Sequence, residues 1–233
     1  MMLNILLTIY GFICRIISVK PKLERKNSTE KELEELREFA EYQKSRSNFR
    51  PERLEVLTKK TKFTKAEIKL IYRGFKQSAP TGTVNKEEFK FSFSILFPYG
   101  DANEYANYVF QTFDMDKNGE VNFEEFVQGL SVISRGTVDE KISWVFALYD
   151  QDERAYITKN DLTRIVTAIY HMVGSEDFTY PPYDRSVIAE HVNTIWEKMD
   201  ANKDGEISRL EFLDACRNDK TVCEALNLFD TRF

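Results

Sequence analysis

One stretch of twelve residues decides the fold of this chain: Asp114-Met115-Asp116-Lys117-Asn118-Gly119-Glu120-Val121-Asn122-Phe123-Glu124-Glu125. Side chains that carry an oxygen stand at its positions 1, 3, 5 and 9, and a glycine at position 6 permits a sharp turn. A glutamate at position 12 supplies two more oxygens. Because Ca²⁺ is a hard cation, it needs roughly six or seven oxygens at about 2.4 Å. The spacing therefore predicts a calcium-binding loop.

This spacing is the EF-hand pattern, and a second complete copy lies near the C-terminus: Asp200-Ala201-Asn202-Lys203-Asp204-Gly205-Glu206-Ile207-Ser208-Arg209-Leu210-Glu211. The predicted metal ligands of the two copies are Asp114, Asp116, Asn118, Glu120, Asn122 and Glu125, and Asp200, Asn202, Asp204, Glu206, Ser208 and Glu211. Ser208, at position 9, is expected to bind through a water molecule. We predict two Ca²⁺ ions, with Mg²⁺ as an alternative occupant at low calcium.

Two further copies, at residues 77–88 and 150–161, are damaged. The first lacks a carboxylate at positions 1, 3 and 5, and Pro80 stiffens its turn. The other has Arg154 where an oxygen is needed, and an alanine replaces the glycine of position 6, which tolerates a left-handed backbone. Its last ligand is Asp161, one methylene shorter than glutamate. We expect neither loop to bind calcium.

The four copies, named loops 1 to 4 in chain order, begin at residues 77, 114, 150 and 200. Apolar residues flank each loop at helical spacing, so we expect a helix on either side. Each loop with its two helices is called a hand. The sequence predicts an all-α fold of four hands in two paired lobes, in which a damaged loop supports an intact one through a short strand contact. The predicted lobes are residues 51–135, with hands 1 and 2, and residues 136–233, with hands 3 and 4 and a C-terminal helix.

The chain before these lobes has a different charge. All 233 residues together carry a net charge of −5, but residues 1–26 have five basic residues and one acidic residue. They therefore carry +4, and the rest of the chain carries −9. Residues 1–19 are apolar except for one narrow helical stripe. We expect a membrane-associating leader at 1–26, on the cytoplasmic side of the plasma membrane or endoplasmic reticulum, and a tether with a short helix at 27–50. Residues 1–19 could span the bilayer, lie in its plane or bury in a partner.

Several classes of protein are disfavoured. Three scattered cysteines do not make a disulfide framework or a zinc cluster, and an acidic module disfavours nucleic acid as a partner. The two histidines, His171 and His191, both fall in predicted helices. Since no nucleophile or phosphate-binding motif is found and the paired carboxylates are assigned to metal, we do not expect an enzyme.

Several stretches outside the ligands point to a family. They are Arg50-Pro51-Glu52-Arg53-Leu54-Glu55, the run from Thr61 to Lys76, Phe97-Pro98, the run from Ser134 to Lys141, Trp144, Leu148-Tyr149-Asp150 and Tyr156-Ile157-Thr158-Lys159. From about residue 50 onward the chain resembles the neuronal calcium sensor family, and within it the Kv channel-interacting proteins. The resemblance implies a calcium-binding regulatory subunit of a voltage-gated A-type potassium channel. Its hydrophobic groove would hold a cytoplasmic N-terminal helix of the channel.

The chain departs from that family in its metal pattern. The family is expected to load calcium in its third and fourth hands, whereas here loop 3 is damaged and loop 2 ends in Glu125. Position 2 is a methionine, so the chain lacks the glycine that the myristoylated sensors acylate.

The chain is rich in aromatic residues, and most of them are expected in the core. We consider Phe93, Tyr108 and Trp144 as walls of a partner groove, which residues 222–233 could cover. Two other functions stay open: a sensor for another membrane-linked client, such as a receptor kinase, cyclase or phosphatase, and a calcium buffer without a client.

Overall fold

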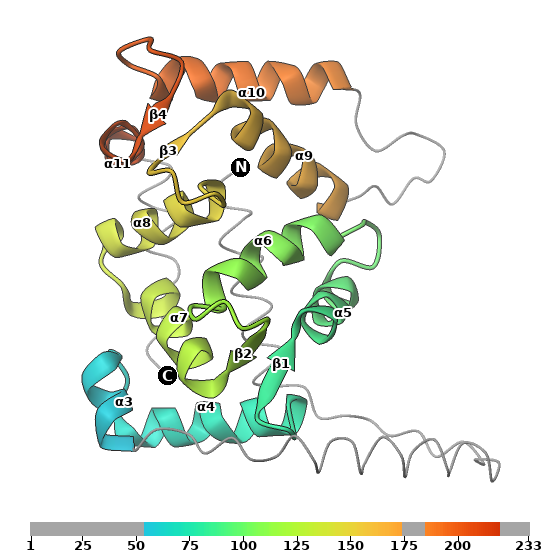
Figure 1. The fold of residues 1–233 in the computed structure, drawn as a ribbon, viewed down its shortest axis with the longest axis vertical. Coiled ribbons are helices and arrows are strands. Elements are labelled where there is room, and N and C mark those ends of the chain that lie inside the picture. The colour runs from blue at the N-terminus through green and yellow to red at the C-terminus, as the bar shows by residue number, and fades with distance from the viewer. Residues whose placement is uncertain (1–53, 174–184, 220–233) are drawn as a thin grey trace, which may run out of the picture.

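The computed structural model describes residues 54–173 and 185–219, and helices dominate both stretches (Figure 1). In chain order the elements are α3 (Leu54–Lys60), α4 (Lys65–Ser78), β1 (Thr83–Asn85), α5 (Lys86–Leu96), α6 (Asn103–Phe113), β2 (Glu120–Asn122), α7 (Phe123–Arg135), α8 (Val138–Tyr149), β3 (Tyr156–Ile157), α9 (Lys159–Val173), α10 (Arg185–Met199), β4 (Ile207–Ser208) and α11 (Arg209–Asn218). The predicted all-α class is confirmed. The leader, the tether and the residues after 219 lie outside the described residues.

The four loops pair through their short strands, as predicted. β1 and β2 run antiparallel with Val84 opposite Val121, and β3 and β4 do so with Ile157 opposite Ile207. These four residues stand at position 8 of their loops. Figure 1 shows the two strand pairs in different parts of the molecule, with α6 between them. Loop 1 is therefore joined to loop 2, and loop 3 to loop 4.

The helix after each loop begins at a residue that the metal pattern also requires. In loop 2, Asn122 caps α7 by accepting from the backbone N–H of Glu125, whose carboxylate accepts in return from the N–H of Asn122. This reciprocal capping box satisfies two backbone donors of the first turn, which no helical carbonyl reaches. Loop 4 repeats the arrangement with Ser208 and Glu211. Positions 9 and 12 thus start the helix and face the loop at the same time.

Aromatic side chains fill the core of the first two hands. Phe89 contacts Phe93, Phe110 and Phe113, with ring centroids 5.4–6.1 Å apart. Phe91, on the same helix, is 66 % exposed. α5 therefore has a buried face and an outward face, and both carry phenylalanine.

The two pairs of hands also contact each other. α6 packs against α8 and α9. Phe113, at the end of α6, meets Trp144 of α8 edge to face, with centroids 6.3 Å apart. The backbone N–H of Asp101 donates to the carbonyl of His171 over 2.9 Å. The predicted boundary between residues 135 and 136 stays a prediction.

A helix that crosses a bilayer needs about 20 predominantly apolar residues. Within residues 54–173 and 185–219, each helix is too short or too polar to cross a membrane. The apolar residues 1–19 lie outside the described residues.

Candidate metal centre

Loop 2 is folded around its first ligand. Asp114 follows the last turn of α6, and its carboxylate accepts from the N–H groups of Asn118, at 3.1 Å, and Gly119, at 2.9 Å. Gly119 has a φ of +85°, a left-handed conformation in which a side chain would be strained. Lys117 is also left-handed, with a φ of +57°. These turns bring the backbone of the loop around the Asp114 carboxylate.

Glu125 reaches back into the same loop from the first turn of α7. Its Oε1 accepts from the N–H groups of Met115 and Asp116, at 3.0 and 3.2 Å, and its Oε2 accepts from that of Asn122 at 3.0 Å. Burial raises the pKa of Glu125, although the backbone hydrogen bonds act in the opposite direction. The carboxylate predicted to be the last ligand is therefore already turned inward.

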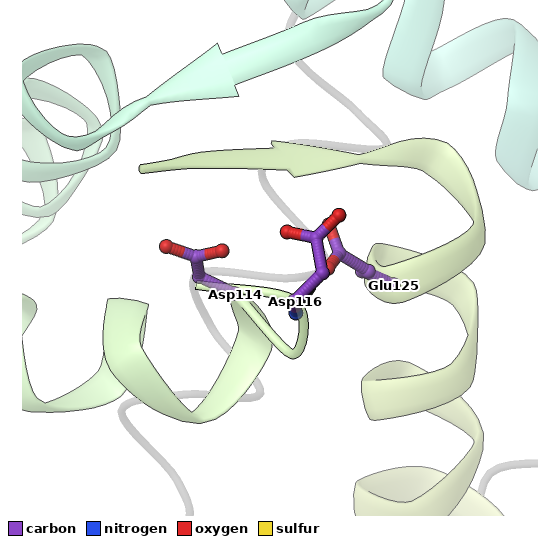
Figure 2. A group of neighbouring side chains, drawn as sticks. All are labelled: Asp114, Asp116 and Glu125. Atoms are coloured by element: carbon purple, nitrogen blue, oxygen red, sulfur yellow. Dashed lines mark hydrogen bonds between the residues drawn. The ribbon is translucent and has the colours of Figure 1, made fainter. Parts of the chain in front are cut away.

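Three carboxylates meet at this point. Oxygen atoms of Asp114, Asp116 and Glu125 lie within 4.8 Å of one another, and Figure 2 shows Asp116 beside Glu125 with Asp114 across from them. Like charges so close repel each other, and a divalent cation bound between them would remove the repulsion. Hard oxygens in this number suit Ca²⁺ or Mg²⁺ rather than a softer metal. The residues of loop 2 therefore fit the expected ion.

Loop 4 has the same backbone turns, with φ of +60° at Lys203 and +86° at Gly205. Glu211 accepts from the N–H of Ser208 at 2.9 Å and from that of Asn202 at 3.3 Å. Although burial raises the pKa of Glu211, hydrogen bonds from Ser208 and Asn202 outweigh it and lower the pKa.

Asp200 supplies the observation that tests loop 4 for a cation. Its Oδ2 accepts from the N–H of Gly205 at 3.3 Å, whereas its buried Oδ1 has no hydrogen-bond partner. A bound cation would satisfy that oxygen. In the described part of the chain, however, three carboxylates gather within 4.8 Å in loop 2 and not in loop 4.

Loop 1 is held without any such ligands. The Nζ of Lys76 donates to the carbonyl of Pro80 over 2.7 Å, and Glu88 and Asn85 form the capping box of α5. Glu88 is exposed and faces no second carboxylate at positions 1, 3 or 5. This arrangement supports the prediction that loop 1 has a structural role.

Two protein-family models match the chain. The model described as an EF-hand domain pair matches residues 139–217, and the model described as an EF hand domain matches residues 106–133. The chain contains EF-hand domains. The matched residues hold loops 2, 3 and 4, and the EF-hand assignment supports calcium binding by the protein.

The three candidates for a partner groove do not lie together on the surface. Phe93 is fully buried, Trp144 is 8 % exposed, and Tyr108 is half-buried on α6. Trp144 borders a cavity of about 560 Å³ between loops 2 and 3, which is also lined by Met115 and Gln151 but not by Phe93 or Tyr108. In this conformation Phe93 is closed to any partner.

Two features of the EF-hand loops were not predicted from the sequence. Arg164, on α9, binds the last residue of loop 3, which its spacing of three residues from Asp161 on a helix could have suggested. Lys117 and Glu153 form an ion pair over 2.6 Å between loops 2 and 3. The sequence pattern of a single loop cannot predict this ion pair, because its two residues belong to different hands.

Proposed function

We propose that this EF-hand protein is a calcium sensor that acts as a regulatory subunit of a voltage-gated A-type potassium channel. It would bind two Ca²⁺ ions, in loops 2 and 4, with Mg²⁺ at low calcium, and hold an N-terminal helix of the channel in a hydrophobic groove. The observation that carries the calcium part is the cluster of Asp114, Asp116 and Glu125 within 4.8 Å. The channel as client rests on the resemblance to the Kv channel-interacting proteins.

The path from loop 2 to the other pair of hands favours a sensor over a buffer. Phe113 directly precedes Asp114 and packs edge to face on Trp144 of α8. A movement of Asp114, the first ligand of loop 2, would therefore be passed through Phe113 to α8 of hand 3. Sensors open a groove when they bind calcium, whereas buffers barely change.

A groove that admits a helix requires the first lobe to rearrange. Phe93 now stacks on Phe89 with centroids 5.4 Å apart and has no exposed surface. We expect calcium to expose Phe93, Tyr108 and Trp144, and residues 1–19 to hold the protein at the cytoplasmic face of a membrane.

The proposal is tested on the full chain with two probes, a channel peptide and an apolar dye. A peptide of the channel's N-terminal helix is titrated into the protein with calcium and with chelator, and an apolar dye reports exposed surface. Channel current is then recorded on co-expression. We expect calcium-dependent dye binding, peptide binding and an altered current.

Each other outcome separates the competing functions. If the dye binds in calcium but the peptide does not bind and the current is unchanged, the channel is not the client. This result favours a kinase, cyclase or phosphatase as client. If calcium exposes no apolar surface, the protein is a buffer. A chain without residues 1–26 that stays equally membrane-bound contradicts the role of the leader.

A further inference from the structure

Loop 3 has the backbone of an ion-binding loop although its ligands are damaged. Glu153 and Ala155, at positions 4 and 6, have φ of +54° and +67°. The same two positions are left-handed in loops 2 and 4. Ala155 adopts this conformation with a side chain that disfavours it. Some interaction must hold the loop in this shape.

The interaction is made by the residue that replaces the oxygen ligand. The guanidinium of Arg154 pairs with the carboxylate of Asp161, at position 12, and its Nη2 lies 3.5 Å from Asp152, at position 3. The N–H of Arg154 donates to Asp150, at position 1, over 2.9 Å. The guanidinium thus lies between carboxylates that would face a metal ion in an intact loop.

Asp161 needs such a partner because it is almost fully buried. Its side chain is 3 % exposed, against 32 % for that of Arg154. Burial alone raises the pKa of Asp161, but hydrogen bonds from Thr158 and Arg164 and the charge of Arg154 outweigh it and lower the pKa. Arg164 binds the other oxygen of Asp161 over 2.6 Å from outside the loop. A buried carboxylate that lost these cations would be strongly destabilised.

We propose that the Arg154 guanidinium is a built-in substitute for Ca²⁺ that keeps hand 3 in its ion-bound geometry at every calcium concentration. Through the β3–β4 pair, in which Ile157 lies opposite Ile207, Arg154 acts as a positioning residue for loop 4. Loop 4 then binds calcium without first having to order its partner loop. This second step rests on the proposed calcium site in loop 4.

The choice of arginine matters for this role. Its planar guanidinium presents several N–H donors in fixed directions. Its Nη2 donates to Asp161 and also lies 3.5 Å from Asp152. Lysine presents a compact charge on a flexible stem. We therefore expect Arg154→Lys to retain part of the function and Arg154→Gln to lose it.

The first experiment compares the full chain with its Arg154→Gln variant in chelator. Arg73→Gln, at an exposed position on α4, is the charge-matched control. Amide hydrogen exchange is measured at residues 156–157 and 207–208. We expect protection in the unsubstituted protein and the control, and faster exchange in Arg154→Gln. Equal exchange in all three proteins would overturn the proposal.

The second experiment measures calcium binding at loop 4 alone, in a background in which Glu125→Gln disables loop 2. We expect Arg154→Gln to weaken calcium binding about tenfold, which is in the range of ordinary coupling between sites. If the calcium affinity of loop 4 is unchanged, Arg154 does not act as a positioning residue for loop 4. If the background binds no calcium, the proposed site in loop 4 has failed, and the exchange in chelator still decides the role of Arg154 in hand 3.

A further variant covers the case in which Arg154→Gln does not fold. Asp161→Asn is added to it, so that the buried charge and its partner are removed together. If Arg154 acts by neutralising Asp161, the double variant folds in chelator and is more stable than Arg154→Gln alone. A double variant that is no more stable than Arg154→Gln would contradict the pairing.

Discussion

At the scale of single residues, Glu125 combines two roles. It completes the capping box of α7 and brings its Oε1 to the N–H groups of Met115 and Asp116. The side chain that caps the helix therefore also lies where the last ligand of the loop is needed. Glu88 has the same place in loop 1 and caps α5, but it has no neighbouring ligands. Comparing Glu88 with Glu125 therefore separates helix capping from metal binding.

This difference predicts the effect of removing one oxygen at position 12. Glu125→Gln and Glu211→Gln should each reduce the stoichiometry of calcium binding from two to one, because the bidentate carboxylate is lost. Glu88→Gln should leave it at two. Calorimetric titration measures all three. Calcium that is retained when both ligands are substituted would place an ion in loop 3.

At the scale of the elements, an ion pair fastens the start of α4 to the end of α7. The guanidinium of Arg135 bonds both carboxylate oxygens of Glu67, and it also stacks on the ring of Phe63 at 4.7 Å. Both partners are more than four-fifths buried. The hydrogen bond from Arg135 lowers the pKa of Glu67 to about 2, despite partial burial.

The lowered pKa predicts how the stability of this contact depends on pH. Because the folded pKa of about 2 is below the unfolded value of 4.5, the pair stabilises the protein above about pH 4.5. The stabilisation is lost as the pH falls toward 2. Glu67→Gln should lower the free energy of unfolding at pH 7 by about 2 kcal/mol, and the difference should shrink below pH 4.5.

Denaturant unfolding in chelator, repeated between pH 7 and pH 3, measures this effect. Glu55→Gln is the control, because Glu55 forms an exposed ion pair with Lys65. Solvent screens such a pair, so we expect no comparable loss. A difference for Glu67→Gln that stays constant down to pH 3 would contradict the assignment.

At the scale of the whole molecule, the two pairs of hands are joined by a close approach at Gly100. A Cβ atom at this position would lie 2.2 Å from the carbonyl oxygen of Met172 and 2.4 Å from that of His171. These are backbone atoms at the end of α9, so they cannot turn aside as a side chain can. Glycine here allows the loop before α6 to bond α9 through Asp101.

Gly100→Ala should therefore separate the two segments. We expect a loss of about 2 kcal/mol in the free energy of unfolding, which is typical of overpacking, and faster hydrogen exchange at Asp101. Gly119→Ala is the contrast: nothing lies within 4 Å of its Cβ, so the cost comes from its left-handed backbone alone. An unchanged exchange rate at Asp101 would mean that the contact gives way easily.

Much of the fold and of the metal site could be predicted from the sequence, because an EF-hand loop is a local object. Its ligands lie within twelve residues, and the same residues that bind the ion also cap the next helix. The helices around the loops, the pairing of loop 1 with loop 2 and of loop 3 with loop 4, and the gathering of Asp114, Asp116 and Glu125 all follow from that spacing.

The sequence by itself therefore determined which segments are EF-hands and that Asp114, Asp116 and Glu125 come together in loop 2. The tertiary structure alone decided what the damaged loop and the surplus aromatics do. Arg154 could have turned to solvent, but the buried Asp161 holds it inside loop 3. Phe93 could have faced a partner, but α6 covers it through Tyr105. These outcomes depend on side chains and helices packed against one another, and no spacing within a single loop encodes them.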